Sequence, residues 1–305
     1  MVSAVTLERV SKTYDDFHAV RDVTFEVPSG RITGFLGPNG AGKTSTLRMI
    51  LGLLPPTAGR ISVLGAEDAT KVRERIGFLP EERGLYKRMT PVDAIVFFAG
   101  LRGLPDAECR KRAVSLLEAQ GLGFAMKRPI KDLSKGMAQK VQLLSALAHE
   151  PDLVVLDEPF SGLDPVNQQA LEAMIREIAA LGATVLFSTH VMQHAERLCD
   201  KVVLMARGQK VFDGDVATAR RAAPRALVLE GDLSADAVAT LPGLGEIKSE
   251  PSPDGGWRHM ARLPEASTGQ EALKAAFARD LPLRRFELKE PSLHDAFIVL
   301  TGGHA

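Results

Sequence analysis

The chain has 305 residues, enough for one large or two ordinary domains with a sizeable buried core. Lysine plus arginine and aspartate plus glutamate each total 38, so the formal net charge is zero. This balance gives no support for nucleic acid or an anionic membrane as a partner of the whole chain. Cys109 and Cys199, the only cysteines, predict reduced thiols of a cytosolic protein.

No segment has the character of a signal peptide or a membrane span. The N-terminus lacks a charged stretch followed by an apolar one. The longest run without Asp, Glu, Lys or Arg, residues 178–195, contains several polar residues. A span needs ~20 mostly apolar residues. If the protein works at a membrane, a partner therefore has to supply the spans.

The first elements along the chain are predicted strands. Residues 5–10 alternate between apolar and polar side chains, and residues 25–27 form a second candidate strand before a turn at Pro28-Ser29-Gly30. A continuous apolar run at 32–36 predicts a third strand. Residues 44–54 have helical spacing. This antiparallel start differs from small kinases and GTPases, which begin near their phosphate loop.

The segment between the third strand and this helix matches the phosphate-loop pattern G-x-x-x-x-G-K-[ST]. Its glycines allow successive N–H groups to point inward and form an anion-binding nest, and the helix N-terminus adds partial positive charge. The lysine can reach the outer phosphates, and the threonine hydroxyl can bind Mg²⁺. The residues expected to bind nucleotide here are Gly37, Pro38, Asn39, Gly40, Ala41, Gly42, Lys43, Thr44 and Ser45.

Strands and helices then alternate, which predicts an α/β fold with a parallel sheet. The segment 90–120 is helical, with Thr90 or Asp106 as candidate caps. The other predicted strands are 61–64, 75–80, 153–156 and 183–187, the other helices are 138–149 and 166–181, and a hairpin joins 202–205 to 210–212.

Composition changes after Asp215, and the basic, alanine-rich stretch 220–225 is a candidate linker. Beyond it the pattern predicts strand, helix, two strands, helix and strand, which is the ferredoxin-like order. These elements are 226–229, 235–241, 245–249, 257–263, 270–278 and 283–288, with a closing helix at 294–300. We therefore divide the chain into residues 1–217 and a small α+β domain, residues 218–305.

Asp157 and Glu158 follow the buried strand 153–156, at the strand end where open α/β sheets place their sites. An aspartate there can hold the Mg²⁺ that Thr44 also binds, and a neighbouring glutamate can orient or deprotonate water. A simple capping pair is the competing interpretation. The phosphate loop makes the catalytic interpretation the stronger one.

Residues 2–215 resemble the ATPase subunit of ABC transporters, because several motifs occur in that family's order. The phosphate loop is followed by a signature-like Leu133–Met137, the acidic pair Asp157-Glu158, a D-loop-like Ser161–Asp164 and His190. The resemblance implies a P-loop ABC ATPase domain with an antiparallel β subdomain and a helical subdomain.

The resemblance also implies roles for single residues. Tyr14 would stack on adenine, Glu158 would be the catalytic carboxylate, and His190 would contact the γ-phosphate. Ser134 and Gly136, which open a helix, would face the nucleotide of a second subunit, so that two ATP molecules lie between two like domains. A simple helix cap is the other interpretation of Ser134.

Two departures from the family pattern stand out. The signature is usually Leu-Ser-Gly-Gly-Gln, but Lys135 and Met137 replace its third and fifth residues. Lys135 either attracts phosphate or points into solvent, and we favour solvent. Glu81, next to Glu82, replaces a usual glutamine; it can still ligate Mg²⁺ but cannot donate as an amide does. The segment 79–86 resembles the sodium- and drug-efflux branch, which also carries a small C-terminal domain.

The leading hypothesis is therefore an ATP-hydrolysing subunit that dimerises on ATP, requires Mg²⁺ and powers export through a separate multi-span permease at the cytoplasmic face of the cell membrane. The alternatives are a soluble ABC-type ATPase acting on nucleic acid or ribosomes, and a small-molecule kinase. A shared metal site of His190 and His194 is the weaker interpretation; we expect His194 at the surface and Trp257 in packing.

Overall fold

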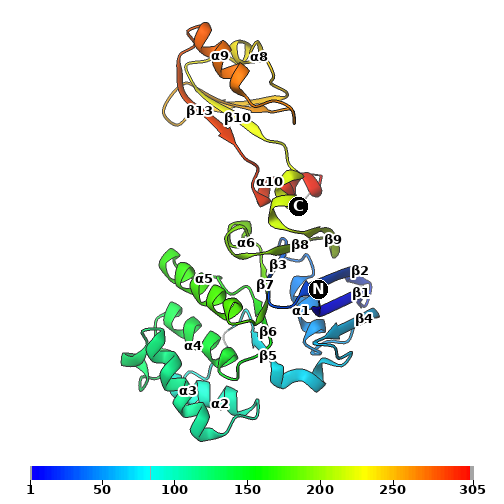
Figure 1. Ribbon diagram of the computed structural model, residues 1–305, viewed down its shortest axis with the longest axis vertical. Helices are drawn as coiled ribbons and strands as arrows, with labels where there is room; N and C mark the ends of the chain where they lie inside the picture. The colour runs from blue at the N-terminus through cyan, green and yellow to red at the C-terminus, as the bar shows by residue number, and fades with distance from the viewer. Residues whose placement is uncertain (1, 83, 303–305) are drawn as a thin grey trace. The chain divides into compact units, whose positions relative to one another are not determined.

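A computed structural model of the chain describes residues 2–82 and 84–302, so Arg83 of the acidic segment lies outside the described residues. The chain divides into two units, one ending at Val216 and the other beginning at Ala217 (Figure 1). Each unit has its own hydrophobic core.

A six-stranded sheet with the order β5-β6-β7-β3-β8-β9 forms the centre of the first unit (Figure 1). In this order, each strand from β5 to β3 pairs in parallel with the next, and β9 pairs antiparallel with β8. β3, β6 and β7 are buried along their whole length, which accounts for their continuous apolar sequences. The strands are β3 (Ile32–Leu36), β5 (Ile76–Leu79), β6 (Leu153–Asp157), β7 (Thr184–Thr189), β8 (Lys201–Ala206) and β9 (Gln209–Gly214).

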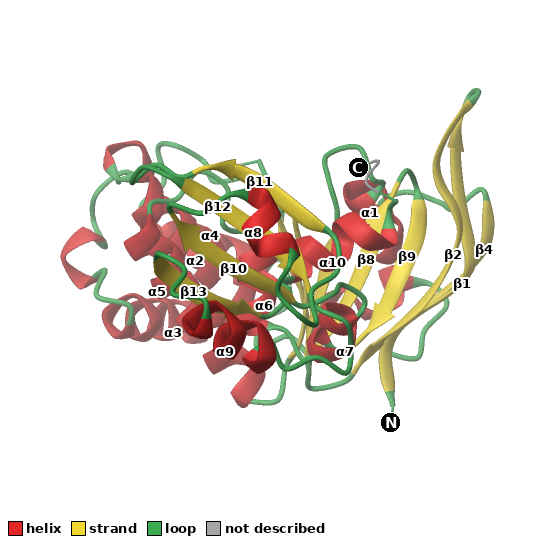
Figure 2. Ribbon diagram, turned by 90° about the horizontal axis from the view of Figure 1, so that it is seen from above, coloured by secondary structure: helices red, strands yellow, loops and turns green. Residues whose placement is uncertain are grey.

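A second, antiparallel sheet has the order β2-β1-β4, with β1 (Ser3–Tyr14), β2 (Phe17–Pro28) and β4 (Ala58–Val63) (Figure 2). β1 and β2 are both longer than the strands predicted at residues 5–10 and 25–27. Register shifts along their pairing let the polar stretch around Lys12 stay extended, so cross-strand pairing overrides local preference. This sheet packs on the parallel sheet around helix α1, and the Phe25 ring stacks on Phe35.

Helices fall into two groups in this unit. Three helices contact strands of the parallel sheet: α1 (Lys43–Ile50), α5 (Pro165–Ala180) and α6 (Met192–Leu198). Three others pack on one another: α2 (Pro91–Gly100), α3 (Asp106–Ala119) and α4 (Lys135–Leu147) (Figure 1). Short 3₁₀ turns lie at Ala69–Arg75, Gly123–Ala125 and Ile130–Asp132.

The predicted helical segment 90–120 is thus two helices. Thr90 caps α2, since its hydroxyl accepts from the Asp93 N–H at 3.2 Å. Asp106 is not a cap: it lies in the first turn of α3, whose N-cap is Pro105. The proline at the cap fixes an extended backbone where the chain enters the helix.

The second unit contains a four-stranded antiparallel sheet with the order β11-β12-β10-β13, the arrangement that the ferredoxin-like succession produces. Two of its helices, α8 and α9, add side chains to the same core as the sheet. The elements are α7 (Val216–Arg221), β10 (Ala226–Gly231), α8 (Ala235–Ala239), β11 (Ile247–Pro251), β12 (Trp257–Arg262), α9 (Gln270–Ala278), β13 (Leu283–Lys289) and α10 (Leu293–Leu300).

Two expectations for this unit were wrong. The candidate linker is partly helical, because Arg220 and Arg221 belong to α7 and the Arg220 guanidinium donates to the Pro291 carbonyl at 2.6 Å. Trp257 does not pack into the core, because it is 44% exposed at the start of β12. His259 is fully buried in this unit instead, and its two nitrogens contact the Ser249 hydroxyl and the Leu233 carbonyl.

Both cysteines are free. Burial raises the pKa of the Cys109 thiol and raises that of Cys199 well above its ordinary value. Because the thiolate is the reactive form, neither side chain is activated. Of the helices in the described ranges, none combines the length and apolar character that crossing a membrane requires.

Candidate nucleotide-hydrolysis site

The phosphate loop has the predicted context, with β3 entering it and α1 beginning at Lys43. Gly40 and Gly42 adopt φ angles of 81° and 95°, a left-handed conformation that glycine tolerates best. A Cβ atom at Gly42 would lie 2.5 Å from the Ala19 carbonyl oxygen, so β2 leaves no room for a side chain there. The loop backbone is therefore closely supported by the antiparallel sheet.

The Lys43 side chain folds back over its own loop. Its ammonium donates to the carbonyl oxygens of Gly37, at 2.7 Å, and Pro38, at 3.2 Å. It also lies 3.4 Å from Glu158 Oε1, and its side chain is 6% exposed. A nearly buried cation held at a helix N-terminus and a glycine loop is well placed to attract phosphate.

Asp157 ends β6 and faces the start of α1. Its Oδ1 accepts a 2.5 Å hydrogen bond from the Ser188 hydroxyl, and the Thr44 hydroxyl lies 3.5 Å from the same oxygen. Ser188 also accepts from the Glu158 N–H at 3.0 Å. Ser188 therefore orients both acids, a role the sequence did not reveal; its position on the neighbouring strand, two residues before His190, was the available signal.

Glu158 has a strained backbone and two charged or polar neighbours. Its φ angle is 46°, uncommon for a residue with a side chain, and such outliers cluster at functional sites. One carboxylate oxygen faces Lys43, and the other lies 3.0 Å from Nδ1 of His190. His190 is 47% exposed, whereas Glu158 is 9% exposed. Lys43, Glu158 and His190 thus form a row of contacts with Glu158 in the middle, although they come from three separate segments.

The chemistry of the acidic strand end suits a hard cation. Thr44 and Asp157 offer an alcohol and a carboxylate oxygen close together, which are donors that Mg²⁺ prefers. Within the described ranges, no group of three or more His, Cys, Asp or Glu side chains is arranged to hold a metal. Mg²⁺ usually keeps several waters and takes substrate phosphate oxygens besides one or two protein ligands, so an alcohol and a carboxylate suit it.

Glu81 follows β5 and lies beside the site, in a pocket that Glu158 also lines. It is exposed and lines a pocket with Glu82, Glu158, Lys135, Gln139 and Ser161. Gln139 and Gln142 are buried polar residues of α4 that the sequence did not single out. Their polar side chains on an otherwise apolar helix face were the signal that could have identified them.

The signature-like segment opens helix α4. Ser134 is the N-cap, because its hydroxyl accepts from the Met137 N–H at 3.2 Å. Ser134 is exposed, while Gly136 is buried against the Asn167 side chain. Lys135 is exposed, as we expected, and its ammonium lies against Gly162 beside the pocket that Glu158 also lines.

Tyr14 ends β1 and is paired with Phe17 across the hairpin turn. Tyr14 is 41% exposed as a residue, and the Lys12 ammonium lies 5.3 Å from its ring centroid. The same hairpin contacts the phosphate loop at Ala19. An exposed aromatic face on an element that borders the loop is suitable for stacking on a base.

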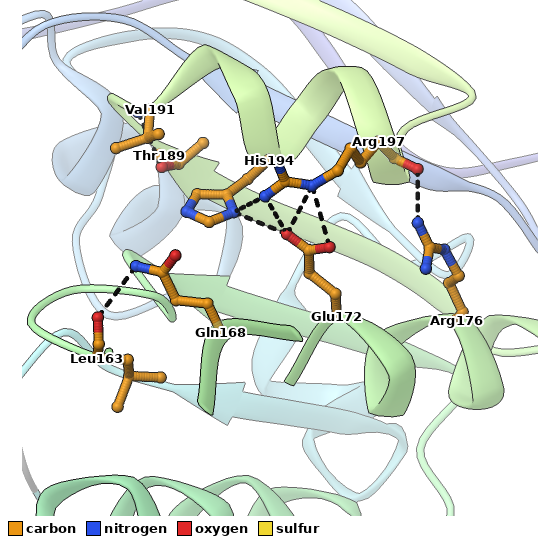
Figure 3. A network of polar contacts seen from close by, with 8 residues as sticks. All are labelled: Leu163, Gln168, Glu172, Arg176, Thr189, Val191, His194 and Arg197. Atoms are coloured by element: carbon orange, nitrogen blue, oxygen red, sulfur yellow. Dashed lines mark hydrogen bonds and ion pairs between the residues drawn. The ribbon is translucent and has the colours of Figure 1, made fainter. Parts of the chain in front are cut away.

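His194 is not at the surface, contrary to the prediction. It is 3% exposed and contacts Glu172 at 2.9 Å (Figure 3). Its ring stacks on that of Phe160 with centroids 4.0 Å apart. Arg197 binds the same carboxylate through two nitrogens. Since α6 begins only at Met192, His190 precedes the helix and does not share a face with His194. The two histidines therefore have separate roles.

The fold and the site define a P-loop nucleotide hydrolase with an added antiparallel sheet. A family model described as ABC transporter matches residues 20–161. Over 299 residues, 98% of each chain, the protein is 37% identical to an uncharacterized ABC transporter ATP-binding protein, YhaQ, of Bacillus subtilis.

A second relative and a solved structure point to the same family. The Nod factor export ATP-binding protein I of Sinorhizobium fredii is 38% identical over 69% of this chain and 62% of its own length. A solved structure titled as an ATP binding subunit of an ABC transporter is 35% identical, with a TM-score of 0.66 over 72% of this chain and 92% of that one.

The chain belongs to the ABC transporter family, as an ATP-hydrolysing, ATP-binding subunit. The predicted P-loop fold, ATPase activity and transporter class are confirmed, and nothing favours a soluble ATPase acting on nucleic acid or ribosomes.

Proposed function

We propose that the chain hydrolyses ATP as one of two like subunits and drives export through a separate multi-span permease at the cytoplasmic face of the membrane. The row of Lys43, Glu158 and His190 is the observation that carries the hydrolytic role. Export is supported by the relative from Sinorhizobium fredii, which is named as a Nod factor export ATP-binding protein. The permease is supported by the relatives' description as transporter subunits.

In this proposal the loop N–H groups and Lys43 hold the phosphates of ATP. Glu158 accepts the proton of a water that attacks the γ-phosphorus, and the bond to the ADP oxygen breaks. His190 contacts the Glu158 carboxylate at 3.0 Å through Nδ1, and we assign its other ring nitrogen to the γ-phosphate. Bound Mg²⁺, held by Thr44 and Asp157 with Glu81 as a further candidate ligand, would neutralise developing charge.

The dimer follows from the signature-like helix. Ser134 is exposed at the N-terminus of α4, where free N–H groups and the helix dipole suit an anion. We assign Ser134 and Gly136 to the ATP of the partner subunit and Tyr14 to adenine. We assign residues 1–217 to the ATP-binding domain and 218–305 to an accessory domain; the division at Val216 supports that boundary.

Glu158→Gln tests the proposal. The amide cannot take the proton, so ATP should bind while hydrolysis falls by at least ~100-fold, a typical general-base effect. Nucleotide then stays between the subunits, and size-exclusion chromatography with ATP and Mg²⁺ should show a dimer. The matched control is Glu118→Gln on α3, which should behave as wild type. A Glu158→Gln protein that stays monomeric and still hydrolyses ATP contradicts the model.

A further inference from the structure

The two departures from the family's motifs meet in space. Glu81 replaces a usual glutamine and Lys135 replaces a usual glycine, yet both line one pocket of about 400 Å³. The described residues around this pocket are Glu81, Glu82, Lys135, Gln139, Glu158 and Ser161. Of these, three are carboxylates and Lys135 alone is cationic. The extra negative charge and the extra positive charge therefore belong to one electrostatic environment.

Helix α4 connects the walls of this pocket. The Gln139 amide donates to the Pro159 carbonyl at 3.1 Å, directly after Glu158. The Gln142 amide donates to the Glu82 carbonyl at 3.3 Å, directly after Glu81. With Lys135 at the first helical position, the three side chains recur at intervals of four and three residues, which places them on one helix face. The helix that carries the cation thus also holds both acidic segments.

The Lys135 ammonium lies beside a turn that has no side chain to exclude it. Gly162 has a φ angle of 62°, and a Cβ atom there would collide with the Lys135 ammonium. The exposed Lys135 side chain therefore passes over the bare backbone of Gly162 at the edge of the pocket.

We propose that Lys135 is a positioning residue that compensates the charge of Glu81. A carboxylate in place of an amide adds repulsion against the polyphosphate of ATP and against Glu158, and an ammonium that lines the same pocket offsets it. This inference rests on the proposed role of Glu158. It predicts that Lys135 is needed only because residue 81 is an acid.

This dependence is tested by measuring the effect of Lys135→Met in two backgrounds, the wild-type chain and Glu81→Gln. Lys135→Met keeps the aliphatic stem and removes the charge, so in the wild-type chain it should raise KM for ATP by about threefold to tenfold, with a smaller change in kcat. In a Glu81→Gln background the same substitution should change KM by less than about twofold. The increase in the wild-type background should shrink in ~0.5 M salt, because salt screens charges near the surface.

Lys135→Arg is the conservative rescue and should keep KM close to wild type. Lys131→Ala, which removes an exposed charge just before α4, is the control and should leave KM unchanged. An equal increase of KM in both backgrounds would show that Lys135 acts on phosphate independently of Glu81, and no increase in either would show that it does nothing; each result overturns the inference. Failure of the proposed function would be seen in a different experiment, because the Glu158→Gln protein would then still hydrolyse ATP.

Discussion

At the scale of single residues, the site depends on side chains that hold one another. Glu158 is restrained at its backbone by Ser188 and at its carboxylate by Lys43 and His190. A buried charge with such partners is costly to isolate, because its desolvation is no longer offset. Each of these residues therefore affects its neighbours as well as the nucleotide.

Lys43→Ala removes the cation of the phosphate loop. ATP affinity should fall by at least ~30-fold, since a charge-assisted contact to phosphate is lost and the loop no longer has its internal ammonium. Isothermal titration with ATP and a steady-state ATPase assay measure this. Lys127→Ala, an exposed lysine outside the loop, serves as the control. Unchanged binding and turnover would mean that the nucleotide site is misassigned.

Gly136→Ala adds a methyl group where none fits. The new Cβ would overlap the Asn167 side chain, which Asp164 holds with a 2.5 Å hydrogen bond. We expect a loss of about 1–3 kcal/mol in unfolding free energy, typical of overpacking. Urea denaturation measures it, with Gly100→Ala in α2, where a Cβ meets nothing within 4 Å, as the matched control. Equal stability of the two variants would contradict this packing argument.

At the scale of elements, α5 and α6 are joined behind the site by the network of Glu172, His194 and Arg197 (Figure 3). The stacking of His194 on Phe160 extends this network to the segment that follows Glu158. Burial raises the pKa of Glu172, but hydrogen bonds from Arg197 and His194 outweigh it and hold that pKa below the ordinary value of 4.5. The network therefore links the strand end that carries Glu158 to the helix that follows His190.

The lowered pKa of Glu172 predicts acid sensitivity. A carboxylate with a depressed pKa contributes stability above its unfolded-state pKa and loses that contribution as pH falls through its folded-state pKa. Unfolding free energy should thus decline below pH 4.5. Glu172→Gln should lower stability at neutral pH by about 2 kcal/mol and flatten that decline.

Chemical denaturation between pH 3 and 7 would compare Glu172→Gln with Glu177→Gln, an exposed acid on the same helix. If both variants show the same pH dependence as wild type, the network does not stabilise the charged carboxylate.

At the scale of the whole molecule, the two units have separate cores, and the second contains its own complete antiparallel sheet. The residues of the candidate site all belong to the first unit. ATP binding should therefore depend on the first unit alone.

A chain that ends at Asp215 tests this separation. It should fold cooperatively and bind ATP within about twofold of the full chain, because the site and its core remain intact. Circular dichroism and nucleotide titration measure the outcome. Copurification of both forms with the membrane partner would then report on the accessory unit. Aggregation of the shortened chain, or loss of ATP binding, would show that the first unit needs the second.

The sequence by itself determined the parts of this protein that depend on short-range stereochemistry. A glycine loop between a strand and a helix specifies the phosphate-binding backbone locally, and the continuous apolar run before Asp157 places two acids at the end of a buried parallel strand. The order of elements also predicted the parallel sheet, the antiparallel strands at the start of the chain and the sheet of the second unit, although strand lengths and helix boundaries depended on pairing and capping.

Only the tertiary structure decided which distant side chains share an environment. His194 is buried because α6 packs on α5, and Ser188 reaches two acids because β7 lies beside β6. Lys135 and Glu81 share a pocket because α4 holds both segments. Burial and electrostatic pairing arise from contacts between elements far apart in sequence, and local patterns carry no information about them.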